Sequence, residues 1–217
     1  MFFLFFGIIA AGFFVVGWVW RIRFRNLRRA ITTSCAGVAA LNGVPCQVTG
    51  TAQAVHSAPF SGTPCVWYRV RATAKTTTGK SVFMDEKSKA PFYLQDETGY
   101  FTVDPEDAAV DAAVQTMDER RPTNGDLPGL PGKTDQVKHY HYEEWILPPG
   151  EPLYVLGTAT GTSIGKDKET GQYSISTRTR RQFARRALLF TAIGYGGGAL
   201  MLVFSAVAVV LDAMEDD

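Results

Sequence analysis

The stretch RTRRQFARRALLFTAIGYGGGALMLVFSAVAVVL, residues 178–211, decides the architecture of this chain. Its first nine residues hold five arginines, and the 25 residues from Ala187 to Leu211 carry no charge. At about 1.5 Å per residue, a helix of this length reaches about 37 Å, more than the roughly 30 Å hydrocarbon core of a bilayer. Its hydroxyl groups are too few to form a polar face. The pattern predicts a transmembrane helix over 187–211, preceded by a basic segment over 178–186.

The start of the chain repeats this arrangement in reverse. Residues 2–20 are uncharged, and five arginines follow between Arg21 and Arg29. A cleaved signal peptide does not fit, because its basic residues would precede its apolar run. We therefore expect a transmembrane helix over 2–20. A basic juxtamembrane helix is expected over 21–43, where Asn42 and Gly43 form a stop signal.

The net charge of +1 hides a strong segregation of charge. Ten of the 22 basic residues lie in the two arginine clusters, and four of the 21 acidic residues lie in the last six positions. The residues between the spans keep 12 basic and 17 acidic side chains, a net charge of −5. Domains that read nucleic acid carry a basic face, so nucleic acid is not an expected partner.

Both arginine clusters lie on the domain side of their spans. The positive-inside rule places such clusters in the cytoplasm. We therefore expect an integral membrane protein with two spans, a cytoplasmic central domain and both termini outside. The same arginines are expected to contact membrane lipids through their headgroups.

The central residues alternate between apolar and polar in short runs. In CVWYRVRATA, residues 65–74, valine and tyrosine fall on one face and arginine on the other, as in a strand. Residues 118–138 hold three prolines, three glycines and few large apolar side chains, so we expect a mobile loop. Over 44–177 the pattern predicts a mostly β domain, a barrel or a sandwich, with one short helix from Asp104. The predicted strands cover 46–55, 65–74, 82–84, 91–95, 100–103, 139–147, 153–160 and 173–177.

Three segments, in order, resemble one known family. They are HSAPFSGTPCVWYRVRA (56–72), APFYLQDETGYFTVDPEDA (90–108) and HYEEWILPPGEPLYVLGTA (141–159). With the two flanking spans, they resemble the GIDE-type domain, also called the "besides a membrane" (BAM) domain, of the Mulan-type mitochondrial E3 ubiquitin ligases. The likeness covers about residues 44–177. The chain looks like a prokaryote-like relative that lacks the RING.

The resemblance implies a domain held at a membrane, but the ligase activity does not carry over. Those ligases have a RING after the second span, and the RING zinc ions need cysteine and histidine ligands. This chain has no cysteine after Cys65, so ubiquitin transfer is not expected. The mitochondrial relatives hold the domain in the intermembrane space, which implies the opposite orientation to the one that the arginines indicate.

Candidate metal ligands do not form a motif. His139 and His141 are two residues apart, so they share a strand face. Cys46, Cys65 or Glu143 could complete a site with them, but nothing in the spacing demands it. Neither a metal nor another cofactor is therefore expected.

Candidate catalytic groups are equally scattered. His56, Ser57 and Cys65 would supply a nucleophile and a base, but turn residues and a buried thiol are the simpler interpretation. Glu143 and Glu144 point to opposite faces of a strand, which argues against a paired-carboxylate mechanism. The three cysteines are expected to be buried free thiols. No catalytic residue is expected.

Arg69 and Arg71 lie on one face of the clearest predicted strand, and they are the expected binding residues. The main hypothesis is a membrane-anchored protein-interaction or sensing module of the GIDE type, without catalytic activity, that binds an unidentified protein. One alternative is a hydrolase or metal-dependent enzyme that uses the histidine and cysteine positions. Another is a divergent component of a ubiquitin-ligase-like system.

Small residues recur at four-residue spacing in both predicted spans. Gly194 and Gly198 form one such pair, and Gly7 and Ala11 form another. Pairs of this kind let helix backbones approach closely in lipid. We expect them to pack the two spans together, or to join protomers into a homo-oligomer.

A cysteine introduced between Asp118 and Lys138 tests the orientation. Because the positive-inside rule places this segment in the cytoplasm, an impermeant maleimide is expected to label it only after the cells are opened. A cysteine at Asp216 is the control, and it is expected to react in intact cells. Labelling of the central segment in intact cells would show that the domain faces outward.

Overall fold

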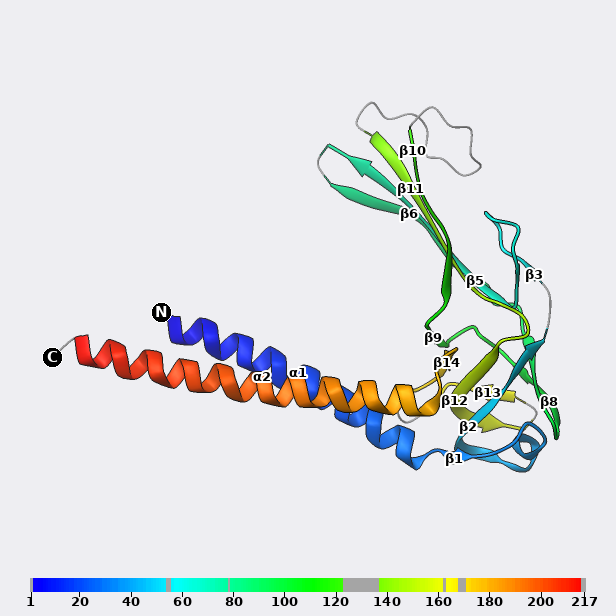
Figure 1. Ribbon diagram of the computed structural model, residues 1–217, viewed down its shortest axis with the longest axis horizontal. Helices are drawn as coiled ribbons and strands as arrows, with labels where there is room; N and C mark the ends of the chain where they lie inside the picture. Colours follow the sequence, from blue (N-terminus) through cyan, green and yellow to red (C-terminus); the bar gives the residue numbers. More distant parts are fainter. Residues whose placement is uncertain are drawn as a thin grey trace. The chain divides into compact units, whose positions relative to one another are not determined.

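The computed structural model describes residues 2–53, 56–77, 79–122, 137–161, 163–167 and 171–215. The chain forms two compact units (Figure 1). Residues 1–30 and 179–217 form a helical unit, and residues 31–178 form a β unit.

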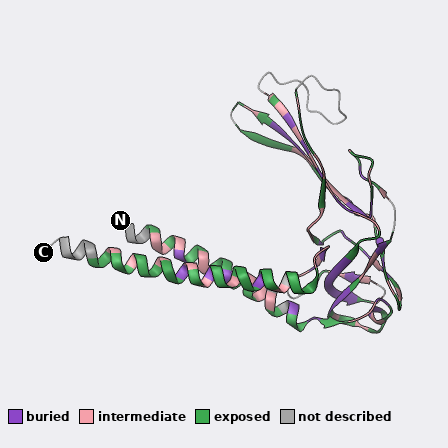
Figure 2. Cartoon of the chain, viewed as in Figure 1, coloured by how far each residue is buried: buried purple, intermediate pink, exposed green. Residues whose placement is uncertain are grey.

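The helical unit consists of α1 (Phe2–Arg29) and α2 (Arg180–Glu215), which lie side by side and antiparallel (Figure 1). Both helices are long and apolar enough to be candidate membrane spans. Most of their surface is exposed (Figure 2), and the exposed side chains include Ile8, Trp18, Leu189 and Val203. Large apolar surface of this kind is expected where lipid is the solvent.

Glycines of α2 lie at its contact with α1. A Cβ atom added to Gly194 would lie 2.5 Å from the Cα atom of Gly17, and one added to Gly198 would lie 2.9 Å from the ring of Phe14. On α1 the two expected small positions lie elsewhere, because a Cβ atom on Gly7 meets nothing within 4 Å and Ala11 is exposed. The close approach therefore uses Gly17, which the four-residue spacing does not identify.

A five-stranded barrel forms the centre of the β unit. Its hydrogen bonds run from β2 to β7, β8, β13 and β12, and then back to β2. All neighbours are antiparallel except β8 and β13. This is the connectivity of the OB-fold, a five-stranded Greek-key barrel. The barrel strands are β2 (Asn42–Gln53), β7 (Phe92–Asp96), β8 (Gly99–Val103), β12 (Pro152–Thr160) and β13 (Ser163–Gly165).

The barrel interior follows from side-chain alternation along each strand. Val48, Leu94 and Leu153 are among the fully buried residues of one apolar core, and alternation directs their sequence neighbours to the other side of each strand. Two of those neighbours, Gln47 and Tyr154, are buried as well, and the Tyr154 hydroxyl donates to Gln47 Oε1 at 2.6 Å. Gly157 is needed where β12 and β13 approach each other, because a Cβ atom there would lie 2.5 Å from the carbonyl oxygen of Gly165. Short elements flank the barrel. They are β1 (Ile31–Thr32), η1 (Ala36–Ala40), β3 (His56–Ser57), β4 (Pro64–Cys65), β9 (Ala109–Asp111) and β14 (Ser174–Ser176).

A second, four-stranded antiparallel sheet is built from two insertions into the barrel. Between β2 and β7 the chain forms the hairpin of β5 (Trp67–Thr76) and β6 (Lys80–Lys87), and between β8 and β12 it forms β10 (Val114–Arg121) and β11 (Val137–Leu147). The strand order is β10, β11, β5, β6. Since β5 pairs with β11, the two insertions join into one sheet (Figure 1).

The expected fold class is confirmed, because two long apolar helices flank a mostly β domain that contains a barrel. Two local expectations differ from the structure. α1 ends at Arg29 instead of continuing to residue 43, since β-branched Ile31 and Thr32 form β1 against β2. The helix expected from Asp104 is a turn, in which the Asp104 side chain accepts a hydrogen bond from the Glu106 amide at 3.0 Å.

The expected loop over 118–138 overlaps two strands. Residues 118–121 belong to β10, and residues 137–138 belong to β11. Pairing with β11 makes a strand of the charged sequence MDERR, whose own strand propensity is low. Residues 123–136 lie outside the described part of the chain.

Replacing Gly194 by leucine is expected to separate the two helices, because its side chain would overlap the backbone of Gly17. The measurement is disulfide formation between cysteines introduced at Trp20 and Phe190, whose rings stack with their centroids 4.7 Å apart. Gly196→Leu is the matched control, since a Cβ atom there meets nothing within 4 Å. Equal crosslinking in both leucine variants would contradict the glycine contact.

Candidate functional site

The four-stranded sheet presents two faces of different chemistry, because successive side chains of a strand alternate. Arg69 lies opposite Trp145 across the pairing of β5 and β11, and Arg71 lies opposite Glu143. Residues paired in this way share a face. This face carries charged groups, whereas the other face carries tyrosines of β11 and alanines of β5 that pack together.

Asp85 of β6 binds both arginines of the charged face. Its carboxylate accepts hydrogen bonds from Nε and Nη2 of Arg69, both at 2.8 Å, and from Nη2 of Arg71 at 3.0 Å. These bonds, led by those of Arg69, hold the pKa of Asp85 well below its usual range. The Arg69 guanidinium also lies 5.9 Å from the ring centre of Trp145, within reach of a cation–π interaction. The two predicted binding residues therefore share one carboxylate.

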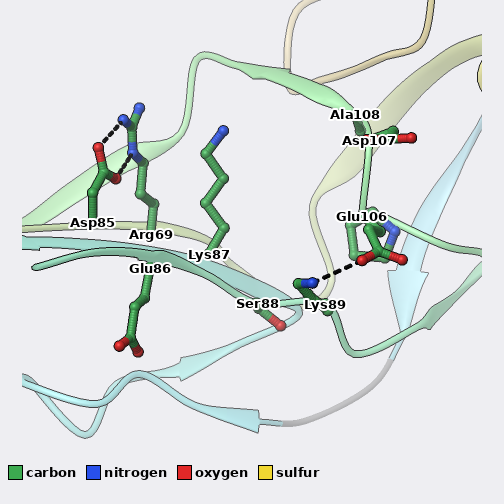
Figure 3. A pocket seen from close by; sticks show the side chains of 10 residues that line it. Arg69, Asp85, Glu86, Lys87, Ser88, Lys89, Glu106, Asp107 and Ala108 are labelled. Carbon is green, nitrogen blue, oxygen red and sulfur yellow. Dashed lines mark hydrogen bonds and ion pairs between the residues drawn. The ribbon is translucent and has the colours of Figure 1, made fainter.

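A cleft of about 750 Å³ opens beside this cluster (Figure 3). It lies between the end of β6 and the turn after β8, where Lys89 and Glu106 form an ion pair at 2.8 Å. Arg69 and Lys87 both line the cleft. Among the described residues, no carboxylate forms an ion pair with Lys87. Of the three cations that line the cleft, Arg69 and Lys89 are paired with carboxylates of the described residues and Lys87 is not. The lining also includes the carboxylates of Asp85, Glu86, Glu106 and Asp107.

The two histidines of β11 share the charged face as expected. His141 Nε2 lies 2.6 Å from Asp118 Oδ1, and its Nδ1 lies 4.0 Å from Glu143 Oε2. The pKa of His139 is lowered by desolvation and by nearby cations, of which Lys75 contributes most. Across the described ranges, no group of three or more histidine, cysteine or acidic side chains is placed to hold a metal ion.

All three cysteines are free and buried, as the sequence analysis expected. Burial, assisted by Asp96, raises the pKa of Cys35 to about 12, and burial raises that of Cys46 to about 11. Burial and the Glu144 carboxylate also raise the pKa of Cys65. The thiolate is the reactive form of cysteine. His56 pairs with Cys65 between β3 and β4, but the environment of that thiol disfavours a nucleophile.

Glu144, which from the sequence was weighed only as a catalytic carboxylate, has a structural role. It is fully buried, and it accepts hydrogen bonds from the amides of Phe60 and Ser61, at 2.8 and 3.2 Å, and from the Thr116 hydroxyl at 2.9 Å. Glu144 therefore fixes the 58–62 turn against the sheet. Its signal in the sequence is its place in the alternation with Tyr140, Tyr142 and Ile146, where an apolar residue is expected.

Asp85→Asn is expected to destabilise the β unit by about 1 kcal/mol at pH 7, because Asp85 is partly exposed and solvent screens its ion pairs. The folded-state pKa of Asp85 lies below its unfolded value of about 3.9. Its contribution is therefore present above about pH 4 and is lost as the pH falls. Denaturant titration of the unmodified protein and of Asp85→Asn in detergent micelles measures the difference in their unfolding free energies. This difference should be smaller at pH 3 than at pH 7. A difference that is equal or larger at pH 3 would contradict a stabilising role of the ion pairs of Asp85.

The family model of GIDE domains, described as E3 ubiquitin ligase, matches residues 68–210. The match begins in β5, next to the arginine cluster, and ends within α2. Neither a curated protein nor a solved structure matches the chain. Since the family match covers well over half of the sequence, the chain belongs to the GIDE family.

Proposed function

We propose that this protein is a membrane-anchored binding module that recruits or senses a protein partner without catalysing a reaction. The single observation that carries this proposal is the cluster of Arg69, Arg71 and Asp85 beside the cleft that Lys87 lines. The cluster holds two guanidinium groups on one carboxylate, and Lys87 adds a further positive charge. Arg69, Arg71 and Lys87 against Asp85 leave a net charge of +2, so we propose that these four side chains bind an acidic segment of a partner protein.

The arginine cluster is suited to binding because it is already ordered. Asp85 occupies Nε and Nη2 of both guanidinium groups. Within the described part of the chain, Nη1 of each has no hydrogen-bond acceptor. Fixing two long side chains before the partner arrives reduces the entropy lost on binding. Arginine and tryptophan are also enriched among the residues that dominate interface energies, and Trp145 lies beside Arg69.

The two candidate spans supply the membrane attachment in this proposal. Arginines follow the apolar run of α1 and precede that of α2, where they would contact anionic headgroups. Tethering raises the local concentration of the domain near membrane partners, so a modest intrinsic affinity suffices. We extend the proposal to a cytoplasmic β unit, on the positive-inside rule, and to self-association through the spans.

The family description favours one second candidate, a component of a ubiquitin-ligase-like system. We propose that the chain does not transfer ubiquitin by itself, because its three cysteines are buried in the β unit and their pKa values are raised. Within a ubiquitin-ligase-like system, this chain would still act by binding a partner protein. Ubiquitin transfer by the purified chain with an activating and a conjugating enzyme would favour the second candidate over the first.

Photo-crosslinking in native membranes tests the binding surface. Benzoylphenylalanine replaces Asp107, an exposed residue of the cleft lining, and in a control it replaces Lys166, which is exposed beside β13. We expect a discrete protein adduct from position 107 only. Arg69→Gln with Arg71→Gln should abolish this adduct, whereas Lys80→Gln, at the far end of β6, should retain it.

Two outcomes would contradict the proposal. One is an adduct pattern that is the same at positions 107 and 166, or that the arginine variants do not change. The other is turnover of a substrate by the purified protein that disappears in His139→Ala, His141→Ala or Cys65→Ala.

A further inference from the structure

The face of the four-stranded sheet opposite the arginine cluster contains an apolar hollow of about 310 Å³. Cavities that bind small molecules begin at about this volume and are lined mainly by apolar and aromatic side chains with a few polar groups. The walls come from the turn between β3 and β4 and from β6, β10 and β11. They consist of Pro59, Phe60, Phe83, Met84, Met117 and Tyr142, with Arg121 as the charged member.

Aromatic rings hold the walls in place. The rings of Phe60 and Phe83 both meet that of Tyr142 edge to face, with centroids 5.8 and 6.4 Å apart. The backbone amide of Phe60 is fixed by the buried Glu144 carboxylate at 2.8 Å. The hollow is therefore formed before any ligand enters, which lowers the entropic cost of binding.

Tyr142 lines this hollow, and its hydroxyl group is unsatisfied. The residue is 5% exposed, and its hydroxyl is buried without a hydrogen-bond partner among the described residues. Buried polar groups without a partner are rare and costly. Burial, followed by the neighbouring Tyr140, raises the pKa of Tyr142. The hydroxyl is therefore protonated at neutral pH and can donate a hydrogen bond.

Arg121 places a cation near this donor. Arg121 lines the hollow, and its positive charge lowers the pKa of Tyr142 in opposition to burial. Nε and Nη2 of Arg121 donate to one oxygen of Glu119, at 2.9 and 2.8 Å. Within the described ranges Nη1 has no acceptor. Tyr142, a neutral hydrogen-bond donor, and Arg121, a cation, therefore both belong to the lining of one apolar cavity.

We propose that this hollow binds the carboxylate of a short or medium-chain fatty acid. The carboxylate accepts a hydrogen bond from the Tyr142 hydroxyl and pairs with Arg121. The hydrocarbon chain lies between Phe60, Phe83, Met84 and Met117. Methionine side chains adapt to irregular apolar shapes, as an unbranched chain requires. The small volume excludes an intact phospholipid. This site is on the opposite face from the arginine cluster, so it is independent of the proposed function.

The test uses the full chain in nanodiscs of neutral lipid, with isotope-labelled methionine methyl groups observed by NMR. Sodium octanoate is the probe, and 1-octanol is its analogue without a carboxylate. Octanoate is expected to shift the Met84 and Met117 signals in a saturable way, with an affinity about tenfold higher than that of octanol. Met201, in α2, reports simple partition into the lipid.

Three variants test the polar contacts. Tyr142→Phe and Arg121→Gln should each weaken octanoate binding about tenfold and leave octanol binding unchanged. Tyr93→Phe, at a half-exposed tyrosine of β7, is the control and should change neither. Before any ligand is added, each variant should give the same Met84 and Met117 methyl signals as the unmodified chain, which would show that the hollow is still folded.

Several results would overturn the site. Octanoate could shift Met201 without shifting Met84 or Met117, which would mean partition into lipid alone. Octanol could bind as tightly as octanoate, or both polar variants could bind octanoate as the unmodified chain does. Any of these results would show that the Tyr142 hydroxyl and Arg121 do not hold a carboxylate.

Discussion

The antiparallel pairing of β5 with β11 is the contact on which both candidate sites depend. It joins ten residue pairs, from Val137 opposite Thr76 to Leu147 opposite Trp67. The two strands belong to different insertions of the barrel, so their contact is non-local. Bringing them together costs loop-closure entropy, and the pairing of the strands must offset this cost. Without this ladder, β5–β6 and β10–β11 would be separate hairpins, and isolated hairpins are marginally stable.

The same ladder separates the chemistry of the two faces. On one face it brings Arg69 and Arg71 next to Trp145 and Glu143. On the other it brings Tyr142 over Ala72, beside the turn that Glu144 fixes. Because a strand directs neighbouring side chains to opposite faces, the two ligands that we propose, an acidic protein segment and a fatty acid, would not compete for one surface. The barrel beneath serves as a scaffold, since function lies in sites and not in the fold that carries them.

The sequence predicts much of this architecture because its signals are local. The uncharged runs predict the candidate spans, and alternation in residues 65–74 and 139–147 predicts the two strands that matter most. The pairing between them is not local, so the sequence alone did not identify the sheet. β10 was missed because its charged residues become a strand only when β11 is beside them. Gly17 was missed because helix contact depends on the partner's register, which spacing within one helix does not fix.

Hydrogen exchange of the full chain tests the central claim that the two insertions form one cooperative sheet. Thr73→Pro removes a backbone donor from β5, which has β11 on one side and β6 on the other. We predict that the amides of β5 and β11 lose protection together in this variant, while those of β2 and β12 in the barrel stay protected. Loss of protection in β5 alone, or in the barrel at the same time, would contradict this account.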